Sequence, residues 1–188
     1  MDYFLSDSHF EDEDIWKMER TQFLTLQAHD EAVSASLKRI SKHDTLYHLG
    51  DIGNLDRIAA LPCRKILIKG NHDTRSKDAY SVIFDEIHEV PLRYSSRIVL
   101  SHKPTPVEQN VLNVHGHFHT GLLMPSANYF CISWNYTQGP VTEKDITKRL
   151  GAIPKKIGFG EEWYQAYVDE KRTGKMTIDI PTWMNTRR

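Results

Sequence analysis

Short apolar runs alternate along the chain with longer segments in which apolar residues recur at helical spacing. Six of the runs have the length and the β-branched or aromatic content of buried strands. They cover residues 3–5, 45–49, 65–68, 97–100, 111–114 and 129–132. The pattern therefore predicts a protein rich in short strands that are joined by polar loops.

Helices are predicted where apolar residues recur every three or four positions. A helix is expected over residues 26–42, with Thr25 as its N-cap and Val33, Leu37 and Ile40 on one face. It is long enough to form the crossover that parallel strands require. Shorter helices are expected at residues 55–61, 76–84 and 142–150.

The two halves of the chain differ in their order of elements. Up to Glu86 strands and helices alternate, whereas beyond it strand follows strand and prolines mark the loops. This order predicts one α/β domain over residues 1–150, with a mostly β second half. Residues 151–188 show no clear period apart from an alternating stretch at 176–180, and we expect them to form a C-terminal extension packed on the same domain.

The composition is that of an ordinary globular protein. The chain has 188 residues, 39% of them hydrophobic and 26% charged, which argues against disorder. The formal net charge of −1 excludes a global positive field that would draw the protein onto nucleic acid, but it does not exclude a local basic patch. Cys63 and Cys131 are too few for a disulfide framework and suit a reducing compartment. Because no signal sequence or membrane-spanning run is evident, we expect a cytoplasmic protein with no membrane partner.

Polar residues suited to metal binding or proton transfer follow the predicted strands directly. They are Asp7, His9, Asp51, Asn71, His72, Asp73, His102, His117 and His119. The loops at the carboxyl ends of strands in an α/β sheet converge on one crevice, so residues far apart in the sequence can meet there. One site is therefore expected.

The types of side chain in this set indicate two metal ions. Apart from His72 and Asp73, the set holds two carboxylates, four imidazoles and one amide oxygen, which exceed the needs of one tetrahedral ion and suit two ions that share a carboxylate. Mixed oxygen and nitrogen ligands favour manganese or iron, with zinc and nickel as alternatives. The absence of cysteine among them disfavours a structural zinc site.

The same residues form motifs that resemble a known family. Asp7-Ser8-His9, Gly50-Asp51, Gly70-Asn71-His72-Asp73, Ser101-His102 and Gly116-His117-Phe118-His119 resemble the five motifs of calcineurin-like metallophosphoesterases, in the family order. The resemblance covers roughly residues 1–137 and is to small stand-alone bacterial or phage-type members. It implies a β-sandwich flanked by helices, in αββα layers.

The resemblance also implies roles for the individual residues. Asp7, His9 and His119 would hold one ion, Asn71, His102 and His117 the other, and Asp51 would bridge the two. A hydroxide between the ions would attack phosphorus in line, and His72 would act as general acid. Asp73 would either orient and charge His72 or cap a helix at residues 74–77, and Arg75 is a candidate substrate ligand that competes with a solvated surface role.

One loop departs from the family pattern. The first motif is followed by the acidic residues 11–14, which would either repel a phosphate substrate or cap the segment that follows. The remaining histidines, His29, His43, His48, His88 and His115, match no motif and are interpreted as structural. His48 and His115 are additionally candidates for supporting a metal ligand.

These features favour a phosphodiesterase that acts on a small-molecule or nucleotide substrate. A phosphomonoesterase, a nuclease of the same chemistry, and a non-catalytic protein-binding scaffold of the same fold are the alternatives. Neutral net charge makes nucleic acid the less favoured partner. The sequence does not predict an oligomeric state.

Overall fold

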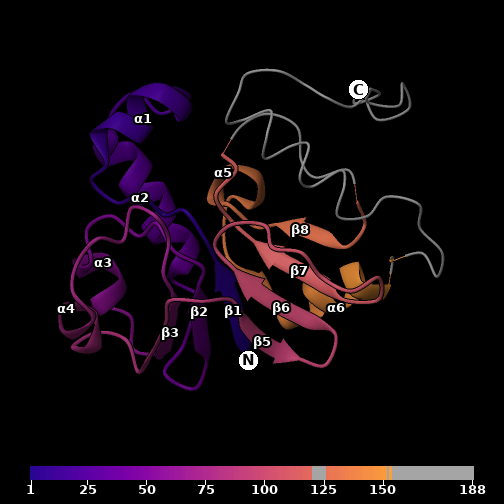
Figure 1. Ribbon diagram of the computed structural model, residues 1–188. Helices are drawn as coiled ribbons and strands as arrows, with labels where there is room; N and C mark the ends of the chain where they lie inside the picture. Colours follow the sequence, from indigo (N-terminus) through magenta and orange to yellow (C-terminus); the bar gives the residue numbers. More distant parts are fainter. Residues whose placement is uncertain (120–125, 152, 154–188) are drawn as a thin grey trace.

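The chain folds into two β-sheets that pack against each other, with helices flanking them (Figure 1). The computed structural model describes residues 1–119, 126–151 and 153. Within these residues the first sheet has the strand order β4-β3-β2-β1-β9 and the second the order β5-β6-β7-β8. The predicted α/β fold class is therefore confirmed.

The first sheet is parallel except at one edge. Its strands are β1 Asp2–Leu5, β2 Thr45–His48, β3 Arg64–Ile68, β4 Glu86–His88 and β9 Val141–Thr142. Strands β1 to β4 run parallel, and β9 pairs with β1 in the antiparallel direction. The parallel strands consequently present their carboxyl ends at the same edge of the sheet.

The second sheet repeats this arrangement. Its strands are β5 Leu92–Ser95, β6 Ile98–Ser101, β7 Leu112–His115 and β8 Tyr129–Cys131. Strands β6, β7 and β8 are parallel, and β5 is antiparallel to β6. All six strands predicted from the apolar runs are present, each with bounds shifted by at most one residue.

The helices agree with the sequence pattern where they bury an apolar face. They are α1 Glu13–Glu19, α2 Leu26–Leu37, α3 Asp56–Ala59, α4 Lys77–Ser81, α5 Trp134–Thr137 and α6 Glu143–Gly151. As predicted, Thr25 caps α2, and its side chain accepts a hydrogen bond from the backbone N–H of Ala28. The helix ends at Leu37 rather than at residue 42, because the chain tightens into a turn that still buries Ile40.

Successive side chains along the strands of the first sheet pack into two separate hydrophobic cores. Tyr3 and Leu5 point to a cluster that also holds Val33 of α2 and Ile58 of α3, whereas Phe4 points to the cluster between the sheets. Figure 1 shows α2, α3 and α4 together on one side of the molecule. Burial on both faces explains why the parallel strands read as continuous apolar runs.

Several sequence expectations fall beyond these elements. The expected extension lies outside the described residues except for Gly151 and Ile153, as does the alternating stretch at 176–180. Both cysteines are free thiols in buried positions. None of the helices in the described part of the chain is long and apolar enough to cross a membrane.

His48 is the last residue of β2, next to the loops at the carboxyl ends of the parallel strands. Its imidazole is fully buried, and Nε2 lies 2.9 Å from the hydroxyl of Ser8. Burial lowers the pKa of His48 from 6.5 to about 4, because a buried imidazolium loses its hydration. The interpretation of His48 as a structural residue agrees with this position in the core.

The titration of His48 predicts a pH dependence of stability. Because the folded pKa lies below the unfolded value, the unfolded chain binds the additional proton, so stability is full above about pH 6.5 and declines as the pH falls towards about 4. His48→Gln removes this contribution and should reduce the slope of unfolding free energy by up to about 1.4 kcal/mol per pH unit. Denaturant unfolding of metal-free protein measures it. Equal slopes for wild type and His48→Gln would contradict the prediction.

Candidate metal centre

The residues that the sequence analysis selected lie on loops that follow five strands. Asp7 and His9 follow β1, and Asp51 follows β2. Asn71 follows β3, while the remaining three histidines come from the second sheet: His102 after β6, and His117 and His119 after β7. The parallel pairing of these strands within each sheet brings the loops to a common edge.

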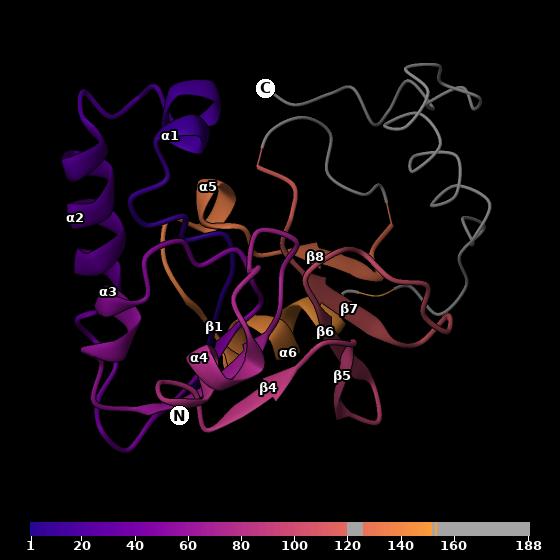
Figure 2. The same cartoon turned by 60° about the vertical axis from the view of Figure 1, so that its left-hand side comes forward.

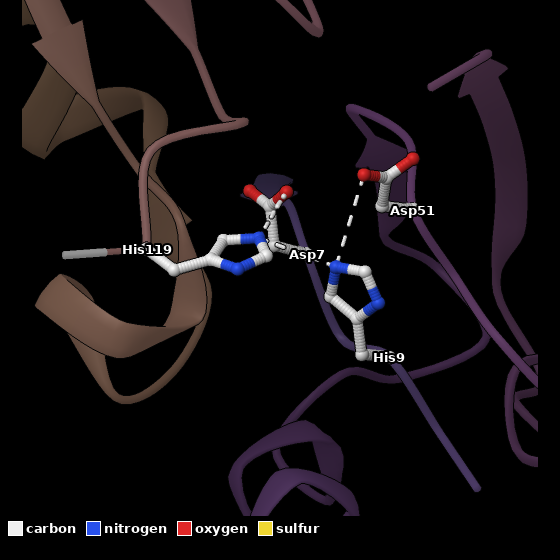
Figure 3. Close-up of side chains that lie close together, drawn as sticks. All are labelled: Asp7, His9, Asp51 and His119. Atoms are coloured by element: carbon white, nitrogen blue, oxygen red, sulfur yellow. Dashed lines mark hydrogen bonds and ion pairs between the residues drawn. The ribbon is translucent and has the colours of Figure 1, made fainter. Parts of the chain in front are cut away.

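At this edge the side chains form two groups that could each hold a metal ion. Asp7, His9, Asp51 and His119 make the first group, shown in Figure 3, and their candidate ligand atoms all lie within 4.8 Å of one another. Asp51, His102 and His117 make the second group by the same measure. Asp51 belongs to both, as expected for a shared carboxylate. That these residues bind metal stays a prediction.

Asn71 completes the second group. Its side-chain oxygen lies 3.0 Å from Nε2 of His102, and the same nitrogen lies 3.2 Å from Oδ2 of Asp51. The Nδ1–H of His102 donates to the backbone oxygen of Leu49 at 2.8 Å. A neutral His102 therefore turns a lone pair towards two oxygen acceptors, which is unfavourable until a proton or a metal cation lies between them.

The first group shows the same mismatch. Nε2 of His9 and Nε2 of His119 lie 3.2 Å apart, while His9 Nδ1 contacts Asp12 at 2.8 Å and His119 Nδ1 contacts Glu19 at 2.6 Å. The outer nitrogen of His9 is hydrogen-bonded to Asp12, and that of His119 lies at ion-pair distance from Glu19, so both imidazoles turn Nε2 towards the cluster. The ligand set of both groups therefore fits divalent cations.

Electrostatics around the cluster favour positive charge. Although burial opposes it, hydrogen bonding to Asp51 and the charges of Asp7 and Asp51 raise the pKa of His102. Burial also opposes ionisation of Asp7, yet its hydrogen bond with His119 and the neighbouring imidazoles hold the pKa of that carboxyl well below its usual range. By contrast, burial lowers the pKa of His117 to about 4. Ionised carboxylates and a neutral imidazole are the forms that bind metal.

The loops that carry these ligands adopt an uncommon backbone conformation. Asp7, His9, Asp51 and His117 have φ angles of 58°, 45°, 56° and 70°. Side chains other than glycine rarely occupy this left-handed region, although Asp and His tolerate it better than most. Such strain concentrates at functional sites, where the surrounding structure imposes it.

Two motif glycines are required by close packing. A Cβ added to Gly70 would lie 2.1 Å from a carboxylate oxygen of Asp51, and one added to Gly116 would lie 2.4 Å from a carboxylate oxygen of Asp7. Any larger residue would displace the carboxylates. The glycines therefore hold ligand positions rather than form ordinary turns.

Asp73 contacts the backbone rather than the imidazole of His72. Its carboxylate accepts hydrogen bonds from the backbone N–H groups of Asp51, Ile52 and Gly70 at 2.9, 3.1 and 2.8 Å. The helix-cap interpretation is wrong, because α4 begins at Lys77 and its cap is Ser76. Asp73 thus ties together the loops that follow β2 and β3, and the catalytic role assigned to it stays a prediction.

His72 lies beside the cluster and not within it. Its side chain is exposed, its ring centroid is 5.3 Å from that of His9, and its backbone N–H donates to Asp51 Oδ1 at 2.8 Å. Arg75 is also exposed but lines a separate hollow of about 510 Å³ together with Glu11 and Asn54. The structure therefore brings His72 to the cluster and leaves Arg75 at a neighbouring surface.

The acidic loop has a structural role that the sequence analysis gave as one alternative. The carboxylate of Asp12 accepts from the backbone N–H of Ile15 and so caps α1. The same residue contacts His9, and Glu19 at the far end of α1 contacts His119, contacts that the sequence pattern did not predict. The sequence feature that could have indicated these contacts is the pair of acidic residues, Asp12 and Glu19, at the two ends of the segment after the first motif.

The other histidines do not contact candidate ligand side chains. His115 is buried, and its Nδ1–H donates to the backbone oxygen of Gly116 at 2.8 Å. His29 is buried against Arg20, His88 pairs with Glu86, and His43 is exposed. Their interpretation as structural residues agrees with these positions.

Comparison with known proteins supports the fold. A protein of unknown function, AQ665 from Aquifex aeolicus, is 29% identical, with a TM-score of 0.63 over 79% of this chain and 98% of that chain. Pseudomonas putida nuclease MPE is 20% identical with a TM-score of 0.41, covering 63% of this chain and 60% of the other. YfcE, a phosphoesterase from E. coli, is 17% identical with a TM-score of 0.34, covering 70% and 77%.

Of these three structures the Aquifex protein has a TM-score above 0.5, and what it supports is the fold. No protein-family model matches the chain, and no curated protein does.

The contacts of Asp73 predict a large cost for its substitution. Asp73→Asn replaces an acceptor-only carboxylate with an amide that cannot accept from all three N–H groups, and it should lower the free energy of unfolding by on the order of 3 kcal/mol. Denaturant unfolding of the metal-free protein measures this. The matched control Asp78→Asn, on the exposed side of α4, should change it by less than about 0.5 kcal/mol. Wild-type stability combined with lost turnover would instead indicate a catalytic Asp73.

Proposed function

We propose that this protein is a metal-dependent phosphoesterase with two divalent ions, and that it hydrolyses phosphodiesters in preference to phosphomonoesters. The observation that carries the proposal is the membership of Asp51 in two adjacent ligand groups, with inward imidazole nitrogens on both sides. Two ions a few ångströms apart are the arrangement used for in-line displacement at phosphorus. Manganese or iron fits the mixed ligands best, with zinc or nickel as alternatives.

In this proposal the residues of the site have different roles. When bound, the ions would supply Lewis acidity and a nucleophilic water at neutral pH. Asp51 would set the spacing of the two ligand groups, and Asp7 and Asn71 would complete them. His72, exposed beside His9 and anchored through its backbone to Asp51, would donate a proton to the leaving oxygen.

The surface beside the cluster supports a small substrate with a group on each side of phosphorus. A cleft of about 330 Å³ is lined by Asn71 and His102 together with the cationic side chains Lys69 and Lys103. The hollow that includes Arg75 adjoins the loop of Asp12, on the side of His9. A diester has two substituents and could place one in each, whereas a monoester would use one.

The alternatives lack a comparable observation. A nuclease would need a broad basic surface, and the net charge of −1 with acidic residues along one hollow disfavours it. A non-catalytic scaffold would not need an exposed histidine beside the ligand cluster. A phosphomonoesterase shares the chemistry and is separated by assay.

Turnover should depend on added metal. Protein stripped with a chelator should be inactive towards an aryl phosphodiester and should recover with Mn²⁺ or Fe²⁺ to a greater extent than with Zn²⁺ or Ni²⁺. The measurement is nitrophenol release from bis(nitrophenyl) phosphate, with nitrophenyl phosphate as the monoester comparison. Binding of two ions without hydrolysis of either compound would favour the scaffold, and faster monoester turnover would reverse the substrate preference.

The role of His72 predicts an effect that depends on the leaving group. His72→Asn should lower kcat for a nucleoside phosphodiester, whose alkoxide leaving group needs a proton, by about 10²–10⁴-fold. The loss should be much smaller with nitrophenolate, which leaves unprotonated, and bound metal should remain at the wild-type level. The exposed His43→Asn should match wild type with both substrates. Equal losses for both leaving groups would exclude His72 as the general acid.

A further inference from the structure

Helix α1 buries no residue, yet it lies at the carboxyl edge of the strands. Figures 1 and 2 show it at the opposite end of the molecule from the N-terminus, where β1 begins. None of its residues is buried, and Met18 is 75% exposed. Ile15 and Trp16 are only half-buried, so apolar packing contributes little to its position and polar contacts contribute the more specific part.

Carboxylates at both ends of α1 contact histidines of the first ligand group. Asp12, its N-cap, contacts Nδ1 of His9 at 2.8 Å, and Glu19, its last residue, lies 2.6 Å from Nδ1 of His119. These histidines are 110 positions apart in the sequence, so one short helix spans two distant loops. Each contact leaves the Nε2 atom facing the cluster.

Arg20, which follows α1 directly, fastens the loop that carries Asp7 and His9. Its side chain is completely buried and donates to the backbone oxygens of Asp7 and Ser8, the latter at 2.9 Å. It also donates to Asn135 at 3.0 Å, and Asn135 in turn donates to the backbone oxygen of Glu19 at 3.3 Å. These bonds connect α1 to the strained backbone beneath the ligands.

The second ligand group has no such support from α1. His102 is oriented by the backbone oxygen of Leu49, at 2.8 Å, and Nε2 of His102 contacts Asn71 and Asp51. A backbone oxygen at the end of β2 is part of the sheet framework. The two groups therefore differ in what holds their histidines.

We propose that residues 12–20 form a positioning segment for one of the two metal ions, the ion of Asp7, His9 and His119. Asp12, through a hydrogen bond, and Glu19, through an ion pair, orient the two imidazoles with Nε2 facing the cluster, and Arg20 fixes the backbone of the Asp7 loop. The segment leaves the ion of Asn71, His102 and His117 unaffected. This inference rests on the proposed function and adds that the two ions depend on different parts of the chain.

Substitution of Glu19 tests the proposal through metal affinity. Glu19→Ala should weaken binding of one ion by about 10–100-fold and leave the other at wild-type affinity, as expected when a carboxylate partner of a ligating histidine is removed. Titration of chelator-treated full-length protein with Mn²⁺, followed by calorimetry and by bound-metal analysis, measures both sites. Glu19→Gln keeps an acceptor but loses the charge, and should fall between wild type and Glu19→Ala.

Glu13→Ala is the matched control on the same helix. Glu13 is exposed and contacts only Lys17 on the helix surface at 2.7 Å in the described structure, so its loss should leave both affinities unchanged. Wild-type affinity at both sites in Glu19→Ala overturns the proposal, as does equal weakening of both sites. If Glu19→Ala does not fold, Glu19→Gln decides, because affinity equal to wild type contradicts a role for the carboxylate.

Failure of the proposed function gives a different result. Wild type that binds two Mn²⁺ ions without hydrolysing any phosphoester would remove the enzyme proposal, while the affinity comparison of Glu19 and Glu13 variants would still decide the role of the segment. Wild type that binds no ion would overturn both. Amide hydrogen exchange gives a second readout: protection of residues 13–19 should rise when Mn²⁺ is added, and unchanged protection counts against the segment.

Discussion

The site depends above all on the position of one carboxylate, that of Asp51. Its Oδ2 lies 3.2 Å from His102 and 3.7 Å from His9, so it faces histidines of both ligand groups, while Oδ1 accepts from the backbone N–H of His72. The residue is 1% exposed and has a φ of 56°. Burying an anion and holding its backbone in a strained conformation both cost free energy of folding. The contacts of Asp51 with its neighbours must offset that cost.

The loop that follows β3 supplies two of those neighbours. Gly70 allows the carboxylate to pack within van der Waals range of the adjoining loop, and Asp73 accepts from the backbone N–H of Asp51 itself. The parallel pairing of β2 and β3 places both loops at the same edge. Asp73 is thus a second buried acid beside Asp51, and its hydrogen bonds in the described structure come from backbone N–H groups. The negative charge of two buried acids favours a cation at the site.

The sequence predicted those elements of the fold that bury apolar side chains at regular spacing. Strands β1, β2 and β3 are buried on both faces and read as apolar runs, and Thr25 marked the start of α2 because a capping side chain is a local signal. Helix α1 was missed because it buries no residue and has no apolar period. The short strand β9 and the four-residue α5 carry too few residues for any period.

The sequence predicted which residues the candidate site brings together, but not the backbone conformation and hydrogen bonds that hold them there. Motif spacing selected Asp7, Asp51 and the histidines that the structure gathers, because ligand chemistry requires particular side chains at strand ends. The left-handed backbone at Asp7 and the three backbone bonds of Asp73 depend on contacts between distant loops, which no local pattern records.

The contrast between α1 and the sheets explains why such contacts escape a sequence pattern. Apolar periodicity reports which residues leave water, and α1 keeps its apolar residues partly or fully exposed while its end carboxylates meet histidines from two loops. Burying an arginine such as Arg20 without partners would cost several kcal/mol, about the price of many core substitutions. Its placement under the Asp7 loop is therefore stabilised by backbone oxygens, by His29 and Asn135, and by the aromatic ring of Trp134. Arg20 therefore connects the loop of Asp7 to Trp134 in the core of the first sheet.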